Sequence, residues 1–157
     1  NILIRLKRDL YILPHKFQKL SEEEFFLIAN LLQTPSYITF TSALSYYNLT
    51  TQQTQNFVES AALKRTKEVK VKQMEFNFSL LKNKFYFGFE RKENFFIATP
   101  AKALADSIYL TAMGKYSIDF DAVDFEKFDK SEIEDILRKS NRASNNLWQK
   151  LIKTYAL

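Results

Sequence analysis

The hydrophobic pattern in the middle of the chain predicts a group of β-strands. Apolar and polar residues alternate over 68–72 and again over 74–78, a period that gives a strand one buried and one exposed face. Residues 57–63 are predicted to form another strand, and residues 85–89 place a Phe at every second position. We therefore expect an antiparallel meander in this part of the chain.

The segment 95–114 predicts a short strand that runs directly into a buried helix. Thr99 is suited to the N-cap, Pro100 to the first helical position and Gly114 to a left-handed end. Between residues 101 and 113 the only polar residues are Lys102, Asp106, Ser107 and Thr111. A helix with so much apolar surface is expected in the core. Because an unpaired buried carboxylate is unfavourable, Asp106 should pair with a basic residue or lie at the helix edge.

Further helices are expected on either side of the strands. Ser21 and Glu24 have the spacing of a capping box, for a helix that ends before Pro35. Thr41 is predicted to cap a helix that runs to about Tyr47. Ser131 and Glu134 form another capping box at the start of a helix, and a last helix is predicted from about Ser144 to Tyr155. The expected class is α+β, with a small antiparallel sheet packed with several helices and preceded by a β-hairpin.

That hairpin is predicted for residues 2–13, whose two apolar arms surround the basic turn Lys7-Arg8-Asp9. Because the sequence starts directly with the first arm, we expect it to be a fragment of a longer protein.

Composition limits the chemistry that these residues can perform. There is no Cys, which excludes thiol catalysis and Cys-ligated zinc, and His15 is the single His. No cofactor is expected. There is no apolar run long enough to span a membrane. Basic residues interrupt the apolar residues at the N-terminus, so this segment does not have the organisation of a signal peptide. We expect a cytoplasmic protein.

The positive charge is gathered in separate stretches, although the net charge is only +5. Separated basic patches are typical of proteins that bind nucleic acid. The residues expected to contact DNA are Arg5, Lys7, Arg8, Lys64, Arg65, Lys67, Lys70 and Lys72. Lysines that only solubilise the protein, or that protect an edge strand from aggregation, would produce the same pattern.

Two acidic patterns resemble catalytic sites in part. Asp119-Phe120-Asp121 alternates like the metal-binding acids of nucleotidyltransferases, but the Gly-Ser turn that such sites need is missing upstream. Glu90-Arg91-Lys92 matches the end of a metal-dependent nuclease signature, in which Glu90 would bind metal and Lys92 would polarise the phosphate. The expected upstream Asp is missing, so we expect no enzyme here.

Four stretches together resemble the AbiEi family of bacterial antitoxins and transcriptional regulators. They are LIRLKRDLYILP, YITFTSALSYYNL, Lys64-Arg65-Thr66 and ATPAKALADSIYL. The chain departs from the family pattern at Asp9 and Asn48, where Gly is common, and at Ala101, where Glu is typical, while Asp106 keeps the usual acid.

The resemblance implies a division of the chain and two roles. Residues 1–16 would be the wing of an N-terminal winged helix-turn-helix whose other parts precede Asn1. Residues 17–157 would form the C-terminal antitoxin domain. Such a protein represses its own operon by binding operator DNA and neutralises a nucleotidyltransferase toxin, without enzymatic activity. The alternatives are a metal-dependent nuclease and a non-catalytic protein-interaction module.

Overall fold

The computed structural model describes residues 2–53 and 55–157. It confirms the α+β class. The strands are β1 (Ile4–Lys7), β2 (Leu10–Ile12), β3 (Ser36–Ile38), β4 (Phe57–Ala62), β5 (Lys67–Val71), β6 (Met74–Leu80), β7 (Phe89–Lys92) and β8 (Phe95–Ala98). The α-helices are α1 (Pro14–Phe17), α2 (Glu22–Leu32), α3 (Phe40–Tyr46), α4 (Pro100–Ala112), α5 (Lys130–Leu137) and α6 (Arg142–Tyr155). Short 3₁₀ turns are η1 (Asn83–Phe85), η2 (Phe120–Ala122) and η3 (Phe125–Lys127).

The main sheet is mixed, so the expected antiparallel meander was wrong. Its strand order is β5-β6-β4-β3-β8-β7, and the pairs β4–β6 and β3–β8 are parallel. The reason lies in the path after β4. The chain skips the neighbouring position, runs along the edge as β5 and returns as β6, which therefore arrives parallel to β4. Alternation along a strand reports its buried face but carries no information about its neighbours.

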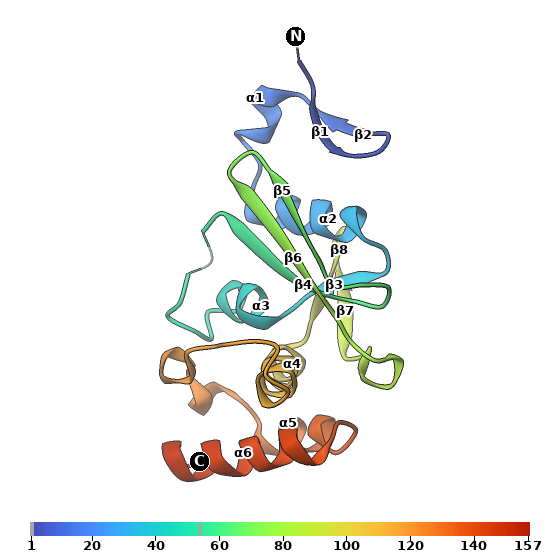
Figure 1. Cartoon of the computed structure of the whole chain (residues 1–157). Coiled ribbons are helices and arrows are strands. Elements are labelled where there is room, and N and C mark those ends of the chain that lie inside the picture. Colours follow the sequence, from blue (N-terminus) through green and yellow to red (C-terminus); the bar gives the residue numbers. More distant parts are fainter. Residues whose placement is uncertain (1, 54) are drawn as a thin grey trace.

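The layers are stacked from the hairpin to the C-terminus (Figure 1). The β1–β2 hairpin lies at one end of the molecule, and α5 and α6 lie at the other. Between them, α2 packs against β3, β4 and β8, α3 packs against β4, and α4 contacts α3, α5 and α6. Among the described residues, no helix is both long and apolar enough to cross a membrane.

Helix α4 confirms the expectation for segment 95–114. The Thr99 hydroxyl accepts a hydrogen bond from the Lys102 backbone N–H at 3.3 Å, Pro100 occupies the first turn, and Gly114 is left-handed with φ of 71°. Residues 101–110 are all buried. The helix is therefore the centre of the core.

Two of the predicted helix starts were wrong. Helix α3 begins at Phe40, so Thr41 lies inside the helix and is not its N-cap. The Thr41 N–H donates to the Glu59 carboxylate at 3.0 Å. Helix α5 is capped by Asp129, which accepts from the Ser131 N–H at 2.9 Å. In both cases an acceptor outside the predicted cap position meets the free N–H groups of the first turn.

The other helix predictions agree with the structure, with one shifted boundary. The capping box of Ser21 and Glu24 opens α2 as expected. Helix α6 begins at Arg142 after an Asn141 cap, slightly earlier than the predicted Ser144.

The strand expected over 85–89 was also wrong in its first half. Phe85 closes the 3₁₀ turn η1, and only from Phe89 does the chain enter a strand. Gly88 has φ of 77°, and its backbone lies against the aliphatic part of Lys102. The Phe85 carbonyl accepts a hydrogen bond from the Lys102 ammonium at 2.8 Å. The local backbone therefore bends around Lys102, which the alternation of Phe residues could not reveal.

Candidate nucleic-acid interface

The β1–β2 hairpin confirms the expected basic turn. Along β1, Ile4 and Leu6 are buried, whereas Arg5 and Lys7 are exposed, as the two-residue period of a strand requires. Asp9 adopts φ of 64° in the turn, a conformation that Asp tolerates better than most residues. The apolar side of the hairpin therefore joins the core and its basic side faces outward.

The second basic stretch connects β4 to β5 and is held by two side-chain hydrogen bonds. The Arg65 backbone N–H donates to Gln33 Oε1 at 3.1 Å. The Thr66 hydroxyl accepts from the Leu80 N–H at 2.9 Å. These bonds fix the backbone of the loop, while the side chains of Lys64 and Arg65 remain exposed.

The two basic stretches meet at one surface hollow of about 260 Å³. We call it the basic hollow, and its lining residues are Lys7, Leu32, Gln33, Thr34, Lys64, Arg65 and Lys67. The Lys7 ammonium reaches across to the Leu31 carbonyl, close to the C-terminal end of α2. A cation at that position is favoured by the partial negative charge of the helix end, which ties the hairpin to the rest of the molecule.

The cations of the basic hollow have no acidic partners. In the part of the chain that the structure describes, Lys7, Lys64, Arg65 and Lys67 form no ion pair with a carboxylate. Their positive charges are therefore uncompensated within a small volume. An anionic group would find an attractive potential there.

The other predicted DNA contacts lie outside the basic hollow. Arg8 is fully exposed at the hairpin turn, 4.0 Å from the carboxylate of Asp9. Lys70 is shared between Glu68 at 3.5 Å and Glu75 at 3.9 Å. Arg5 is exposed on β1, and Lys72 is exposed in the β5–β6 turn with φ of 54°. The structure thus brings Lys7, Lys64, Arg65 and Lys67 together and leaves Arg5, Arg8, Lys70 and Lys72 apart.

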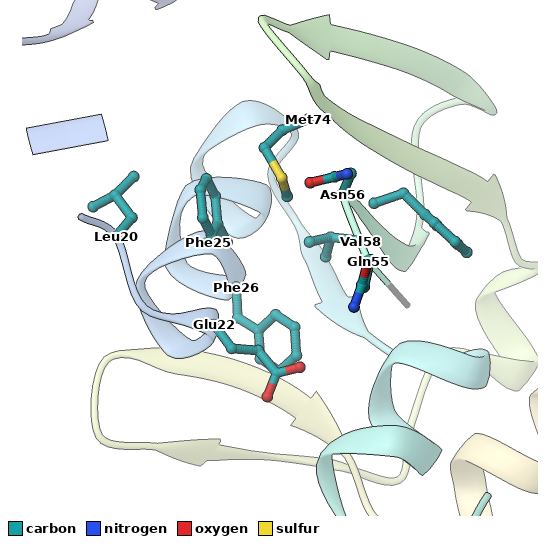
Figure 2. Close-up of a pocket in the computed structure, with 9 residues that line it drawn as sticks. Leu20, Glu22, Phe25, Phe26, Gln55, Asn56, Val58 and Met74 are labelled. Atoms are coloured by element: carbon teal, nitrogen blue, oxygen red, sulfur yellow. The ribbon is translucent and has the colours of Figure 1, made fainter. Parts of the chain in front are cut away.

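A second hollow, of about 250 Å³, is unsuited to an anion (Figure 2). One wall comes from Leu20 and the start of α2, and the other from Gln55, Asn56 and β4, with Met74 of β6. Its lining contains the carboxylate of Glu22 but no Lys or Arg. The arrangement offers neither a nucleophile with a base nor a set of metal ligands.

The nuclease alternative has no observation in its favour. Glu90 is exposed on β7, an edge strand of the sheet, and the Lys92 ammonium lies 5.3 Å from the centre of the Tyr47 ring. Within residues 2–53 and 55–157 there is no group of three or more His, Cys, Asp or Glu side chains that could hold a metal ion. Asp121, from the other acidic pattern, accepts a hydrogen bond from the Tyr155 hydroxyl.

In two buried polar clusters, the ionisable side chains are hydrogen-bonded to neighbouring residues and do not line an open cavity. Lys102 pairs with Asp106, which also accepts from the Thr39 hydroxyl at 2.7 Å and the Tyr37 hydroxyl at 2.8 Å. Burial raises the pKa of the Asp106 carboxyl, and the Lys102 ammonium acts against that rise. Asp106 therefore pairs with a basic residue, one of the two outcomes expected from the sequence.

The second cluster surrounds Glu59, which is 9% exposed. Its carboxylate accepts from the Tyr116 hydroxyl at 2.8 Å as well as from Thr41. Burial raises the pKa of Glu59 to about 7, although these hydrogen bonds act in the opposite direction. Glu59 stabilises the start of α3 and has no catalytic partner.

The sequence did not indicate Leu32, Gln33 or Thr34 as part of the basic hollow, and Gln33 is the one whose side chain bonds to the basic loop. It follows the last residue of α2 as its C-cap and precedes Thr34 and Pro35. Its contact with Arg65 joins positions 32 residues apart, so no local pattern marks it.

Comparisons of the chain with protein-family models, with curated proteins and with solved structures gave no match. The resemblance to the AbiEi family therefore depends on the four sequence stretches alone.

Proposed function

We propose that this chain is a non-enzymatic cytoplasmic antitoxin that binds DNA, represses its own operon and neutralises a nucleotidyltransferase toxin. The four AbiEi-like stretches support the family, and the basic hollow supports the DNA contact. The single observation that carries the proposal is the convergence of Lys7 with Lys64, Arg65 and Lys67, from stretches far apart in sequence.

The charge arrangement favours a phosphate backbone as the ligand. Clustered cations repel one another, and neutralising phosphates with Lys and Arg releases the counterions condensed on DNA. A contact made only to phosphates is indifferent to base sequence. We therefore expect this chain to bind DNA weakly, with strong dependence on salt, while base recognition in the family belongs to the helix-turn-helix.

The DNA-binding role can be tested with a matched pair of charge reversals. A variant with Lys64→Glu and Lys67→Glu should lose most of its affinity for duplex DNA at low salt. A control with Lys150→Glu and Lys153→Glu changes the net charge equally, but on α6, at the other end of the molecule. Equal loss in both variants would mean that only the net charge matters, and would remove the basic hollow from the proposal.

The antitoxin role needs a separate experiment, because the four AbiEi-like stretches do not indicate which residues contact the toxin. If a nucleotidyltransferase gene lies directly downstream of this gene, co-expression of the two should restore the growth that the toxin inhibits. Absence of protection by a soluble, folded chain would contradict the antitoxin role. DNA binding without protection would favour a regulator of another kind, and protection without DNA binding would favour the protein-interaction module.

A further inference from the structure

The side-chain amide of Gln33 has a hydrogen-bond partner for its oxygen but none for its nitrogen among the described residues. Gln33 is 6% exposed, and its Oε1 accepts from the Arg65 backbone N–H at 3.1 Å. Its Nε2 is buried and has no hydrogen-bond partner among the described residues. Most buried polar atoms in proteins are paired, so an unpaired donor on a residue that lines a surface hollow indicates a missing acceptor.

The orientation of this amide follows from its partner. A backbone N–H can only donate, so the oxygen of Gln33 must face Arg65 and the nitrogen must point away from it. The missing group must therefore be a hydrogen-bond acceptor.

The surroundings of Gln33 specify the charge of that acceptor. Gln33 lines the basic hollow together with Lys7, Lys64, Arg65 and Lys67. These cations form no ion pair with a carboxylate in the described residues. One backbone carbonyl, that of Leu31, already accepts from Lys7, and an ammonium group has two further donors. An anion with several acceptor oxygens would use the free donors and neutralise the charge.

We infer that the basic hollow is a discrete binding site for one phosphate group of a nucleic-acid backbone, with Gln33 Nε2 as its neutral donor. That the phosphate belongs to DNA rests on the proposed function, whereas the site itself rests on the unpaired amide and the cations around it. The hollow of about 260 Å³ has room for a phosphate group and accompanying water.

The site combines two parts of the chain, which gives it a second property. Lys7 comes from the hairpin, whereas Lys64, Arg65 and Lys67 come from the β4–β5 loop and β5. A phosphate bound between them holds the hairpin in place against the sheet, because each oxygen can bridge donors from both parts. Binding should therefore slow backbone amide exchange in β1 and β2 as well as in the loop.

The test uses the whole chain, inorganic phosphate as the first probe and a short DNA duplex as the second. In an NMR titration, phosphate should shift the side-chain NH₂ resonances of Gln33 and slow amide exchange in the hairpin. Gln33→Glu keeps the oxygen that accepts from Arg65, but it replaces the donor by a negative oxygen. It should weaken binding of both probes about tenfold or more.

The matched control is Gln149→Glu, the same change at an exposed position of α6. It should bind both probes as the unchanged chain does. Thermal unfolding of both variants establishes that they are folded, and the titration of the unchanged chain needs no variant.

The outcomes separate the site from the proposed function. If Gln33→Glu binds phosphate and DNA like the control, the site is overturned while DNA binding stands. If phosphate shifts Gln33 and Gln33→Glu removes this effect, but DNA does not bind at any salt concentration, the phosphate site stands and the proposed function fails. If phosphate leaves the Gln33 resonances unchanged up to saturating concentration, the inference is wrong.

Discussion

The side chains of Lys102 and Asp106 form an ion pair one helical turn apart in α4, and both are 0% exposed. The ammonium also donates to the Phe85 carbonyl at 2.8 Å and to the Tyr37 hydroxyl at 3.0 Å, and it lies 4.1 Å from the centre of the Phe85 ring. The pair therefore joins α4 to β3 and to the turn before β7.

Removing one member of this pair should destabilise the fold strongly. Lys102→Met fills a similar volume but leaves Asp106 buried without its cation, so we expect a loss of about 3–5 kcal/mol in the free energy of unfolding. The measurement is urea unfolding followed by circular dichroism.

The double variant Lys102→Met with Asp106→Asn should be more stable than the single one, because Asn still accepts from Tyr37 and carries no charge. An exposed control, Lys153→Met, should change stability by less than about 0.5 kcal/mol. A single variant as stable as this control would contradict the role of the pair.

Gly88 and Gly114 provide a comparison between backbone strain and steric clash. Both have left-handed φ, of 77° and 71°. A Cβ at Gly88 would lie 2.8 Å from Lys102 Cγ, whereas a Cβ at Gly114 would meet nothing within 4 Å. Gly114→Ala should cost roughly 1–2 kcal/mol for the conformation alone. Gly88→Ala should cost clearly more, because it also displaces Lys102. If Gly88→Ala and Gly114→Ala lost equal stability in thermal or urea unfolding, the Lys102 side chain would move aside without an energetic penalty.

The buried carboxylate of Glu59 should make stability depend on pH. Its pKa in the folded chain is about 7, against an ordinary value of 4.5. Between these values the folded state binds the proton more tightly than the unfolded state. The contribution of Glu59 to stability is therefore complete below about pH 4.5, falls as the pH rises and becomes constant above about pH 7.

Glu59→Gln isolates this effect, since Gln retains an oxygen for Thr41 and Tyr116. The stability of the unchanged chain relative to Glu59→Gln should fall by an amount on the order of 1–3 kcal/mol across this pH range. Taking the difference between the two proteins cancels the other titrating groups. A difference that stays constant with pH would show that Glu59 titrates normally.

The lysines of β5 and the preceding loop should differ in their effect on DNA affinity. Lys64 and Lys67 line the basic hollow, whereas Lys70 is paired with Glu68 and Glu75. If Lys64 and Lys67 each contact a phosphate, replacing both by Ala should reduce the slope of log K against log salt by roughly 1.5–2. Lys70→Ala should leave the slope nearly unchanged. Equal effects would mean that DNA contacts the whole β5 edge.

Local signals predicted the elements well, and the reason is physical. The Thr99-Pro100 start of α4, its Gly114 end and the capping box of Ser21 and Glu24 each depend on groups within a few residues. The basic turn of the hairpin likewise follows from alternation around three polar residues. In the same way, α3 ends at Tyr46, next to the predicted end at about Tyr47, and Asn48 beyond it is left-handed with φ of 60°.

Contacts between distant positions could not be predicted from the sequence. Asp106 accepts from Tyr37 across 69 positions, and Arg65 meets Gln33 across 32. The parallel pairing of β4 with β6 and the burial of Lys102 depend on such contacts too. For the basic hollow, the sequence supplied the cations but neither the subset that converges nor the amide among them.

The hydrogen bond between Glu59 and the Thr41 N–H has a consequence for the order of folding. Helix α3 is short, and the side chain of its N-cap residue, Thr39, bonds to Asp106 and does not cap the helix. Its first turn therefore depends on an acceptor 18 residues later in β4. A helix of this length has little stability of its own. Helix α3 should therefore become ordered only when β4 docks beside it, and pulse-labelling during refolding should protect the two in the same step.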